Sequence, residues 1–377
     1  MNKRVLTVAA VLLIAVIVVL FVKTQNQQVE KADSITIGAI LPLTGSAAPY
    51  GQNAQRGIDL AVSEINAGDG ISGKKVIVLY EDSKTEPKEA VAALQKLFNS
   101  NGVRYVIGDI NSTGLLAMAP IAERNKILLL SPGASNPKVS DAGDYIFRNW
   151  HSDALEGQVD AEYAFLSMKW KTAAVLYVNA AYGAGLAETF KKVFEKQGGR
   201  VVAYEAYAQD ATNMREQISK IIAVQPDGLY LPGWPKEMSV ALKQLKELGS
   251  NIPVLSAQGF DDPSILRLAG DAAEGVIFSV PQQPDPNDET VKSFLEKYKT
   301  TYNREPGVCS ASGYDALMIY AEAINEVGDD PENVQGFMAE LKGFSGADGP
   351  VSFDKYGDLL KPFVFKKVYK GKFEQLK

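Results

Sequence analysis

The stretch ILLLSPGASNP (127–137) joins four apolar residues to a turn built from Ser, Pro, Gly, Ala and Asn. A short apolar run bounded by turn residues is typical of a strand buried on both faces of a parallel sheet. Ser131, Ser135 and Asn136 then lie where this strand ends. Such a turn could hold a phosphate, house a nucleophile, receive a carboxylate or simply redirect the chain, and the rest of the sequence decides between these roles.

Upstream of this stretch, apolar strands alternate with amphipathic helices. Ser112 is the expected N-cap of the helix that precedes ILLL. Buried strands that alternate with helices predict a parallel sheet covered on both faces. The predicted strands are 35–43, 75–83 and 103–110, and the predicted helices are 51–67, 87–102 and 112–126.

The same alternation restarts after YIFRNWH (145–151), and 377 residues are enough for two domains. We therefore predict an α/β protein with two doubly wound parallel-sheet lobes. The further strands are expected at 172–179, 200–208, 228–233, 253–259 and 276–281, followed by helical stretches at 287–303, 310–328 and 331–344 and by strand-like runs at 349–358 and 363–376.

The N-terminus begins with MNKR, followed by 18 uncharged residues at 5–22. This pattern is typical of an export signal or a membrane anchor. Neither a small-x-small cleavage site nor a lipidation cysteine follows the apolar run directly, so cleavage and anchoring to the inner membrane are equal alternatives. In both cases we expect the chain from about residue 34 to lie in the periplasm or otherwise outside the cytoplasm.

Composition and motifs argue against several classes of function. The net charge of −6 leaves no basic face for nucleic acid. One histidine, His151, and one cysteine, Cys309, argue against a transition-metal site and against a Cys–His catalytic pair. The sequence has no phosphate-loop motif and no G-x-S-x-G nucleophile elbow. We therefore expect no catalysis, no cofactor, no metal and no nucleic-acid partner.

The loops at the strand ends favour binding of a small polar molecule. Ligands of open α/β sheets bind beyond the C-terminal ends of the strands. Here those loops are rich in Ser, Thr, Asn, Tyr and Trp. Short hydroxyl side chains let backbone N–H groups approach a carboxylate. Four aromatic residues could cover the apolar part of a ligand: Tyr50, Trp150, Tyr182 and Trp234.

Eight segments follow one another along the chain: ITIGAILPLTG, AVSEINAGDGISGKKV, VIGDINST, ILLLSPGASNP, YIFR, AAYGAG, LAGDAAEGV and GPVSFDKYGD. In combination they resemble the branched-chain amino-acid-binding proteins of bacterial ABC importers, which have the type I periplasmic binding protein fold. The resemblance implies two lobes joined by a three-crossing hinge, with the ligand in the cleft. Residues 34–152 and 281–350 would form lobe 1, 153–280 and 351–377 lobe 2, and 1–33 the signal or anchor with its linker.

The resemblance also implies which residues contact the ligand. Ser112, Ala134 and Ser135 match positions that receive the ligand's carboxylate, with Ser135 in place of the family's Thr. The opening turn would therefore be half of a carboxylate-binding site. The family's aromatic positions match Tyr50, Tyr182 and Trp234.

One position departs from the family's pattern. The acidic residue that receives the ligand's ammonium group aligns with Gln258. A neutral amide supplies no charge, and a buried unpaired ammonium costs on the order of several kcal/mol. Either Asp261 turns inwards, although we expect Asp261 and Asp262 to cap a helix, or the ligand lacks an amine. Trp150 and Trp234 would suit a larger or aromatic acid.

We therefore predict an extracytoplasmic solute-binding protein that delivers its ligand to the membrane permease of an ABC importer. The ligand would be a small carboxylate, first of all an aliphatic amino acid of the branched-chain type. The alternatives are a binder of an aliphatic or aromatic acid without the amine, a ligand sensor tethered to the membrane, and a two-lobed enzyme, for which no set of catalytic residues is present.

Overall fold

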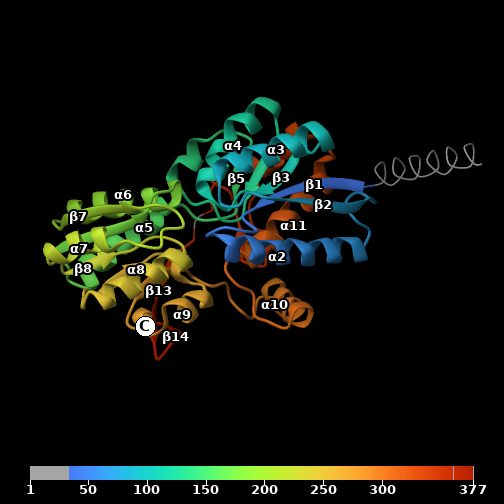
Figure 1. Cartoon of the computed structure of the whole chain (residues 1–377). Coiled ribbons are helices and arrows are strands. Elements are labelled where there is room, and N and C mark those ends of the chain that lie inside the picture. Colours follow the sequence, from blue (N-terminus) through green and yellow to red (C-terminus); the bar gives the residue numbers. More distant parts are fainter. Residues whose placement is uncertain (1–33, 360, 377) are drawn as a thin grey trace, which may run out of the picture.

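Two separate sheets organise the chain in the computed structural model, which describes residues 34–359 and 361–376 (Figure 1). The first sheet has five parallel strands in the order β2-β1-β3-β4-β5. The second has seven strands in the order β14-β13-β10-β9-β8-β6-β7. Helices cover both faces of each sheet, so the predicted fold class of two doubly wound lobes is confirmed.

The first sheet and its helices, called lobe 1 below, form two hydrophobic layers. Side chains of β1 alternate between them, with Ile37 packed toward α2 and α11 and Ile40 toward α3 and α4. The strands are β1 (Ser34–Leu41), β2 (Lys75–Asp82), β3 (Tyr105–Gly108), β4 (Leu128–Ser131) and β5 (Ile146–Arg148); the helices are α2 (Ala48–Ala67), α3 (Pro87–Asn101), α4 (Ser112–Asn125), α10 (Glu289–Tyr302), α11 (Ser310–Val327) and α12 (Pro331–Ala339).

The second sheet and its helices form lobe 2, and this sheet is not wholly parallel. β10 and β13 pair antiparallel, as do β13 and β14, because the chain returns to this sheet at its end as a hairpin. The strands are β6 (Thr172–Val178), β7 (Arg200–Tyr207), β8 (Gly228–Tyr230), β9 (Val254–Ser256), β10 (Ile277–Pro281), β13 (Phe363–Tyr369) and β14 (Lys372–Gln375); the helices are α5 (Asp153–Glu162), α6 (Ala181–Lys196), α7 (Arg215–Ala223), α8 (Pro235–Glu247) and α9 (Pro263–Ala269).

The chain passes between the two sheets three times. These connections join β5 to α5, β10 to α10, and the small hairpin of β11 (Phe344–Gly346) and β12 (Gly349–Val351) to β13. The number of these connections agrees with the three hinge crossings that were predicted. The residue limits given above for the two lobes stay a prediction.

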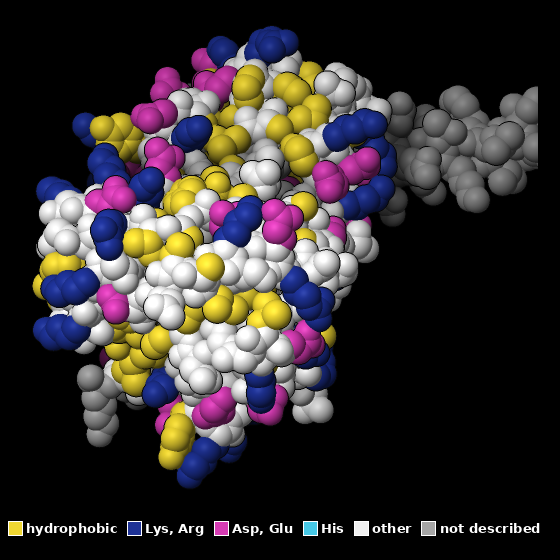
Figure 2. All heavy atoms as spheres, turned by 60° about the vertical axis from the view of Figure 1, so that its left-hand side comes forward, with side chains coloured by type: hydrophobic (Ala, Val, Ile, Leu, Met, Phe, Trp, Pro, Cys, Tyr) yellow, Lys and Arg dark blue, Asp and Glu magenta, His cyan; other side chains and the backbone are white. Residues whose placement is uncertain are grey.

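The export signal or anchor predicted at 5–22 lies outside the described residues. In the part of the chain that the structure describes, no helix combines the length and apolar character needed to cross a membrane. Figure 2 shows lysine and arginine side chains interspersed with aspartate and glutamate on one face of the molecule. The surface charge on that face therefore has no single sign.

Candidate ligand-binding site

A cavity of about 40 Å³ lies where the strand-end loops of the two lobes meet. The structure brings most of the predicted ligand-binding residues together around it. Ser112 and Ala134 do not line the cavity; each lies in or behind the turn that forms one wall. Six predicted residues do line it: Tyr50, Ser135, Trp150, Tyr182, Trp234 and Gln258.

Hydrogen bonds from two serines hold the turn after β4. Ser131 Oγ accepts from Ala134 N at 2.8 Å, and Ser112 Oγ accepts from Ser135 N and Asn136 N at 3.2 Å. The expected N-cap role of Ser112 was wrong, because the side chain of Asn111 caps α4 by accepting from Thr113 N. A hydroxyl that accepts two hydrogen bonds still has its own proton to donate. Ser112 therefore shapes the turn from behind the cavity wall, and its own hydroxyl proton stays available for donation.

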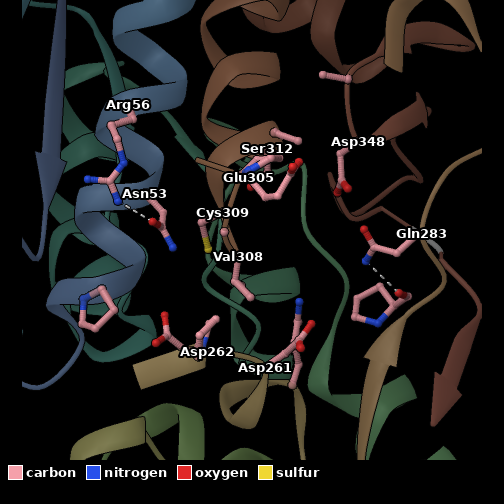
Figure 3. A pocket seen from close by; sticks show the side chains of 18 of the residues that line it. Asn53, Arg56, Asp261, Asp262, Gln283, Glu305, Val308, Cys309, Ser312 and Asp348 are labelled. Carbon is pink, nitrogen blue, oxygen red and sulfur yellow. Dashed lines mark hydrogen bonds between the residues drawn. The ribbon is translucent and has the colours of Figure 1, made fainter. Parts of the chain in front are cut away.

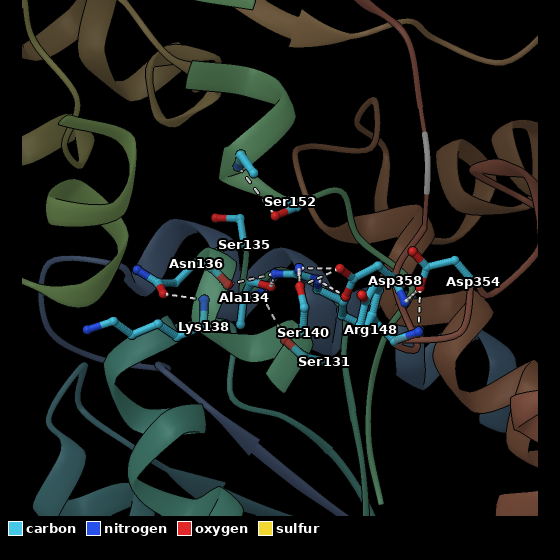
Figure 4. Close-up of polar contacts among 12 residues, drawn as sticks. Ser131, Ala134, Ser135, Asn136, Lys138, Ser140, Arg148, Ser152, Asp354 and Asp358 are labelled. Atoms are coloured by element: carbon cyan, nitrogen blue, oxygen red, sulfur yellow. Dashed lines mark hydrogen bonds and ion pairs between the residues drawn. The ribbon is translucent and has the colours of Figure 1, made fainter. Parts of the chain in front are cut away.

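Arg148 supports the same turn from behind (Figure 4). Its side chain is fully buried, and Nη1 donates to Asn136 O at 2.9 Å. Its Nε and Nη2 atoms donate to the two carboxylate oxygens of Asp358 at 2.6 and 2.7 Å. Asp358 belongs to the connection between β12 and β13. This bidentate ion pair fixes the binding turn to a segment about 210 residues away in sequence.

Aromatic side chains from both lobes form the opposite wall. The rings of Tyr182 and Trp234 are stacked with centroids 6.2 Å apart. Tyr182 OH accepts from Gly259 N at 3.1 Å, and Tyr50 OH donates to Gly259 O. Burial raises the pKa of both tyrosines, so they remain neutral. A Cβ at Gly259 would lie 2.2 Å from Gly233 O, so glycine is required for this close approach.

The two aspartates after Gln258 have different roles. Asp262 caps α9 by accepting from Ser264 N at 2.7 Å, as predicted. Asp261 instead forms an ion pair with Lys366 on β13 at 2.8 Å and does not line the cavity. The expected capping role of Asp261 was therefore wrong. Its carboxylate does turn toward the larger hollow between the lobes, which it helps to line, and there it pairs with Lys366.

Sequence reasoning missed Glu156 on α5, which also lines the cavity. Its Oε1 atom accepts from Gln258 N at 2.6 Å and from Ser279 Oγ at 3.0 Å. The signal was present in the sequence, because Asp153, Glu156 and Asp160 are spaced to share one face of a helix. A helix face that carries three buried acids is unusual enough to mark a site.

Cys309 contributes an apolar part of the wall. It is buried, and burial raises the pKa of its thiol well above the usual range, so the thiol stays protonated. This agrees with the expected role of a small buried apolar residue rather than a nucleophile.

A larger hollow of about 720 Å³ adjoins the cavity (Figure 3). The two share Trp150, Gln258, Val308 and Cys309 as walls. Charged side chains from both lobes surround the hollow, among them Arg56 on α2 of lobe 1 and Asp261, just before α9 of lobe 2. The small cavity is therefore the inner end of a wider cleft between the lobes.

Several hydrogen bonds join the two lobes directly. Ala181 N at the start of α6 donates to Thr113 Oγ1 at 2.9 Å, and Asn136 Nδ2 donates to Ala181 O. Gln209 Nε2 donates to Thr85 O at 2.9 Å. These contacts would have to break for the two lobes to move apart.

The model of the periplasmic binding protein family matches residues 34–371. The chain belongs to this family. The resemblance and the fold predicted from the sequence are thereby confirmed. Periplasmic binding proteins are solute-binding proteins rather than enzymes, and membership implies a location outside the cytoplasm.

Individual periplasmic binding proteins are similar to this chain over nearly its whole length. A leucine-, isoleucine-, valine-, threonine- and alanine-binding protein of Pseudomonas aeruginosa is 30% identical over 338 residues, 89% of each chain. The leucine-binding protein LivK of Thermotoga maritima is 29% identical with a TM-score of 0.86, covering 91% of this chain and 98% of that one. LivJ of Streptococcus pneumoniae, solved in complex with isoleucine, is 27% identical with a TM-score of 0.83, covering 90% and 98%.

One buried carboxyl group at the site predicts a pH dependence of stability. Burial raises the pKa of Asp109, at the end of β3, to about 7. Between about pH 4 and pH 7 the unfolded chain releases this proton while the native chain retains it, so native stability falls as the pH rises. The Asp109→Asn variant has no such proton. We expect its melting temperature to match the parent near about pH 4 and to exceed it by a growing margin up to about pH 7.

Thermal unfolding over a pH series measures this difference. The exposed Asp69 supplies the control, and Asp69→Asn should follow the parent at every pH. Parallel curves for the parent and Asp109→Asn would contradict the prediction.

Proposed function

We propose that this chain is the substrate-binding protein of an ABC importer and that it binds an aliphatic α-amino acid of the branched-chain type between its lobes. The observation that carries the proposal is the single cavity to which both lobes contribute polar and aromatic residues that were predicted from the sequence. The names of the relatives from P. aeruginosa and T. maritima point to the same class of ligand.

In the proposed mechanism, the ligand binds first to lobe 1. The hydroxyl of Ser135 in the cavity wall and that of Ser112 directly behind this wall receive its carboxylate, and lobe 2 then closes with Tyr182 and Trp234 over its apolar part. Contacts made only in the closed form shift the equilibrium between open and closed states. The closed form would present both lobes to a membrane permease, which is the proposed partner.

A thermal-shift screen of the full chain, refolded to remove carried ligand, tests the function. Each aliphatic amino acid is paired with the matching acid that lacks the amine, and aromatic acids are included. A ligand at about 100 times its dissociation constant stabilises the folded state by about 2.7 kcal/mol, which gives a visible shift. We expect aliphatic amino acids to stabilise the chain. If none of these compounds produced a shift, the proposed function would be wrong.

The carboxylate contact is tested by the double variant Ser112→Ala/Ser135→Ala. We expect it to weaken binding of a carboxylate ligand by about 1–3 kcal/mol, because the ligand's buried oxygens lose hydrogen-bond donors. Isothermal titration calorimetry measures the change. The matched control is Ser63→Ala/Ser100→Ala, which removes two exposed hydroxyls of lobe 1 and should leave affinity unchanged. Equal affinities of the two double variants would refute the contact.

The segment 5–22 would export the chain, either as a cleaved signal or as a retained anchor in the inner membrane. N-terminal sequencing of the exported protein distinguishes the two. A chain that is retained at the membrane and signals ligand binding without any importer would instead fit the alternative role of a tethered sensor.

A further inference from the structure

The face of α5 that turns inward carries three carboxyl groups. Asp153, Glu156 and Asp160 follow one another at spacings of three and four residues, and each is at most 1% exposed. Burying one ionised carboxyl group is costly unless a positive charge or several hydrogen bonds compensate it. Three on one helix face therefore require an explanation.

The charged groups nearest to this face do not neutralise it. Arg148 is paired with Asp358, and Lys361 is paired with Asp348 at 2.7 Å. His151 lies with Nε2 3.4 Å from Glu156 Oε2, but burial lowers the pKa of His151, which favours its neutral form. Among the described residues, no cationic side chain therefore forms an ion pair with the acids of α5.

The three acids differ in their partners. Asp160 accepts from Tyr230 OH at 2.7 Å, whereas neither carboxylate oxygen of Asp153 has a hydrogen-bond partner. Burial, followed by the charge of Glu156, raises the pKa of both aspartates, which favours their neutral forms. Asp153 and Asp160 do not line the cavity.

Glu156 is the member of the set that reaches the cavity. The backbone N–H of Gln258 and the hydroxyl of Ser279 both donate to its Oε1 atom. Two donors on one carboxylate oxygen fix the position of the Glu156 side chain. Gln258 lines the same cavity, so the carboxyl group of Glu156 lies beside the neutral amide.

We propose that Glu156 receives the ammonium group of the ligand, so that this chain selects α-amino acids over the matching acids that lack the amine. The proposal rests on the proposed function and specifies the chemistry of that site. A metal ion is the other cation that such a cluster could attract, but in residues 34–359 and 361–376 no three His, Cys, Asp or Glu side chains converge to hold one. An ammonium ion needs only hydrogen-bond acceptors and a negative charge at one end of the cavity.

The test compares leucine with isocaproate, which is leucine without its amine, by calorimetry on the full chain. For Glu156→Gln we expect affinity for leucine to fall by about 100-fold, because one partner of a buried charge pair is lost. Affinity for isocaproate should stay the same or rise. An equal loss for both ligands would show a structural role only, and no loss for leucine would overturn the proposal.

Two further variants test whether misfolding, rather than loss of the carboxylate, causes a loss of leucine affinity. Glu237 on α8 is also fully buried in lobe 2 but lies outside the cavity lining, so Glu237→Gln should not change the preference between the two ligands. The double variant Glu156→Gln/Gln258→Glu moves the carboxylate to the neighbouring wall. We expect it to regain leucine affinity over Glu156→Gln alone, and failure to regain it in a folded double variant would count against a charge requirement.

The parent chain separates this proposal from the function on which it rests. If the parent binds isocaproate as well as or better than leucine, a carboxylate-binding function holds and the role of Glu156 is wrong. If the parent binds neither these ligands nor any other in the thermal-shift panel, the proposed function itself fails.

Discussion

Replacing Asp358 by alanine is expected to lower the free energy of unfolding by about 3–5 kcal/mol, because it leaves the guanidinium of Arg148 buried without its counter-charge. Arg148 has no exposed surface, and Asp358 is only 6% exposed. Water that entered the vacated space would not restore the lost negative charge. Ser140 Oγ, which donates to Asp358 at 2.6 Å, would lose its acceptor as well. Denaturant unfolding of the parent and the variant measures the difference.

A surface ion pair supplies the control for this prediction. Arg215 and Glu247 form an ion pair in lobe 2 whose side chains are about half exposed, so solvent screens their attraction. Glu247→Ala should change the unfolding free energy little. If Asp358→Ala lowered the free energy of unfolding as little as Glu247→Ala, the buried ion pair would not stabilise the fold as described.

The same substitution should also weaken the ligand site. Arg148 Nη1 donates to Asn136 O, and this bond depends on the position that Asp358 gives to the guanidinium. We therefore expect Asp358→Ala to reduce ligand affinity even in the folded fraction, in the same direction as loss of the serine hydroxyls.

The second large effect is expected for Trp234→Ala, which should weaken ligand binding by about 2–4 kcal/mol. Trp234 is buried, stacks on Tyr182 and lines the cavity directly before α8. Removing its indole deletes the apolar surface that would cover the ligand and lets water into the closed site. Calorimetry gives both the dissociation constant and the fraction of active protein.

Trp170 distinguishes loss of binding from loss of folding. It is equally buried in lobe 2, but it packs in the core between α5, α6 and the sheet and does not line the cavity. Trp170→Ala should lower stability while the protein that remains folded binds with the parent affinity. A similar loss of affinity in both tryptophan variants would refute a direct role for Trp234.

The sequence by itself determined the class of fold and most of the candidate site. Strand and helix periodicity depend on residues a few positions apart, so the alternation of elements could be read directly. The rule that ligands bind beyond parallel strand ends then singled out loops that do meet at one cavity, including those of Tyr50 and Trp150. Capping by Asp262 was predictable for the same reason, because a cap needs only its own helix.

Only the tertiary structure decided which distant groups share a charge or a hydrogen bond. Asp261 pairs with Lys366 across 105 positions, and Glu156 accepts from the backbone of Gln258 across 102 positions. Ser112 holds the turn of Ser135 instead of capping its own helix. These contacts depend on how elements that lie far apart in the chain pack against one another. The free energies of the contacts depend on burial, which a local sequence pattern does not record. Periodicity placed the residues at the cleft, but the packing of α5 against α6 and β10 within lobe 2 placed a carboxyl group in the cavity wall.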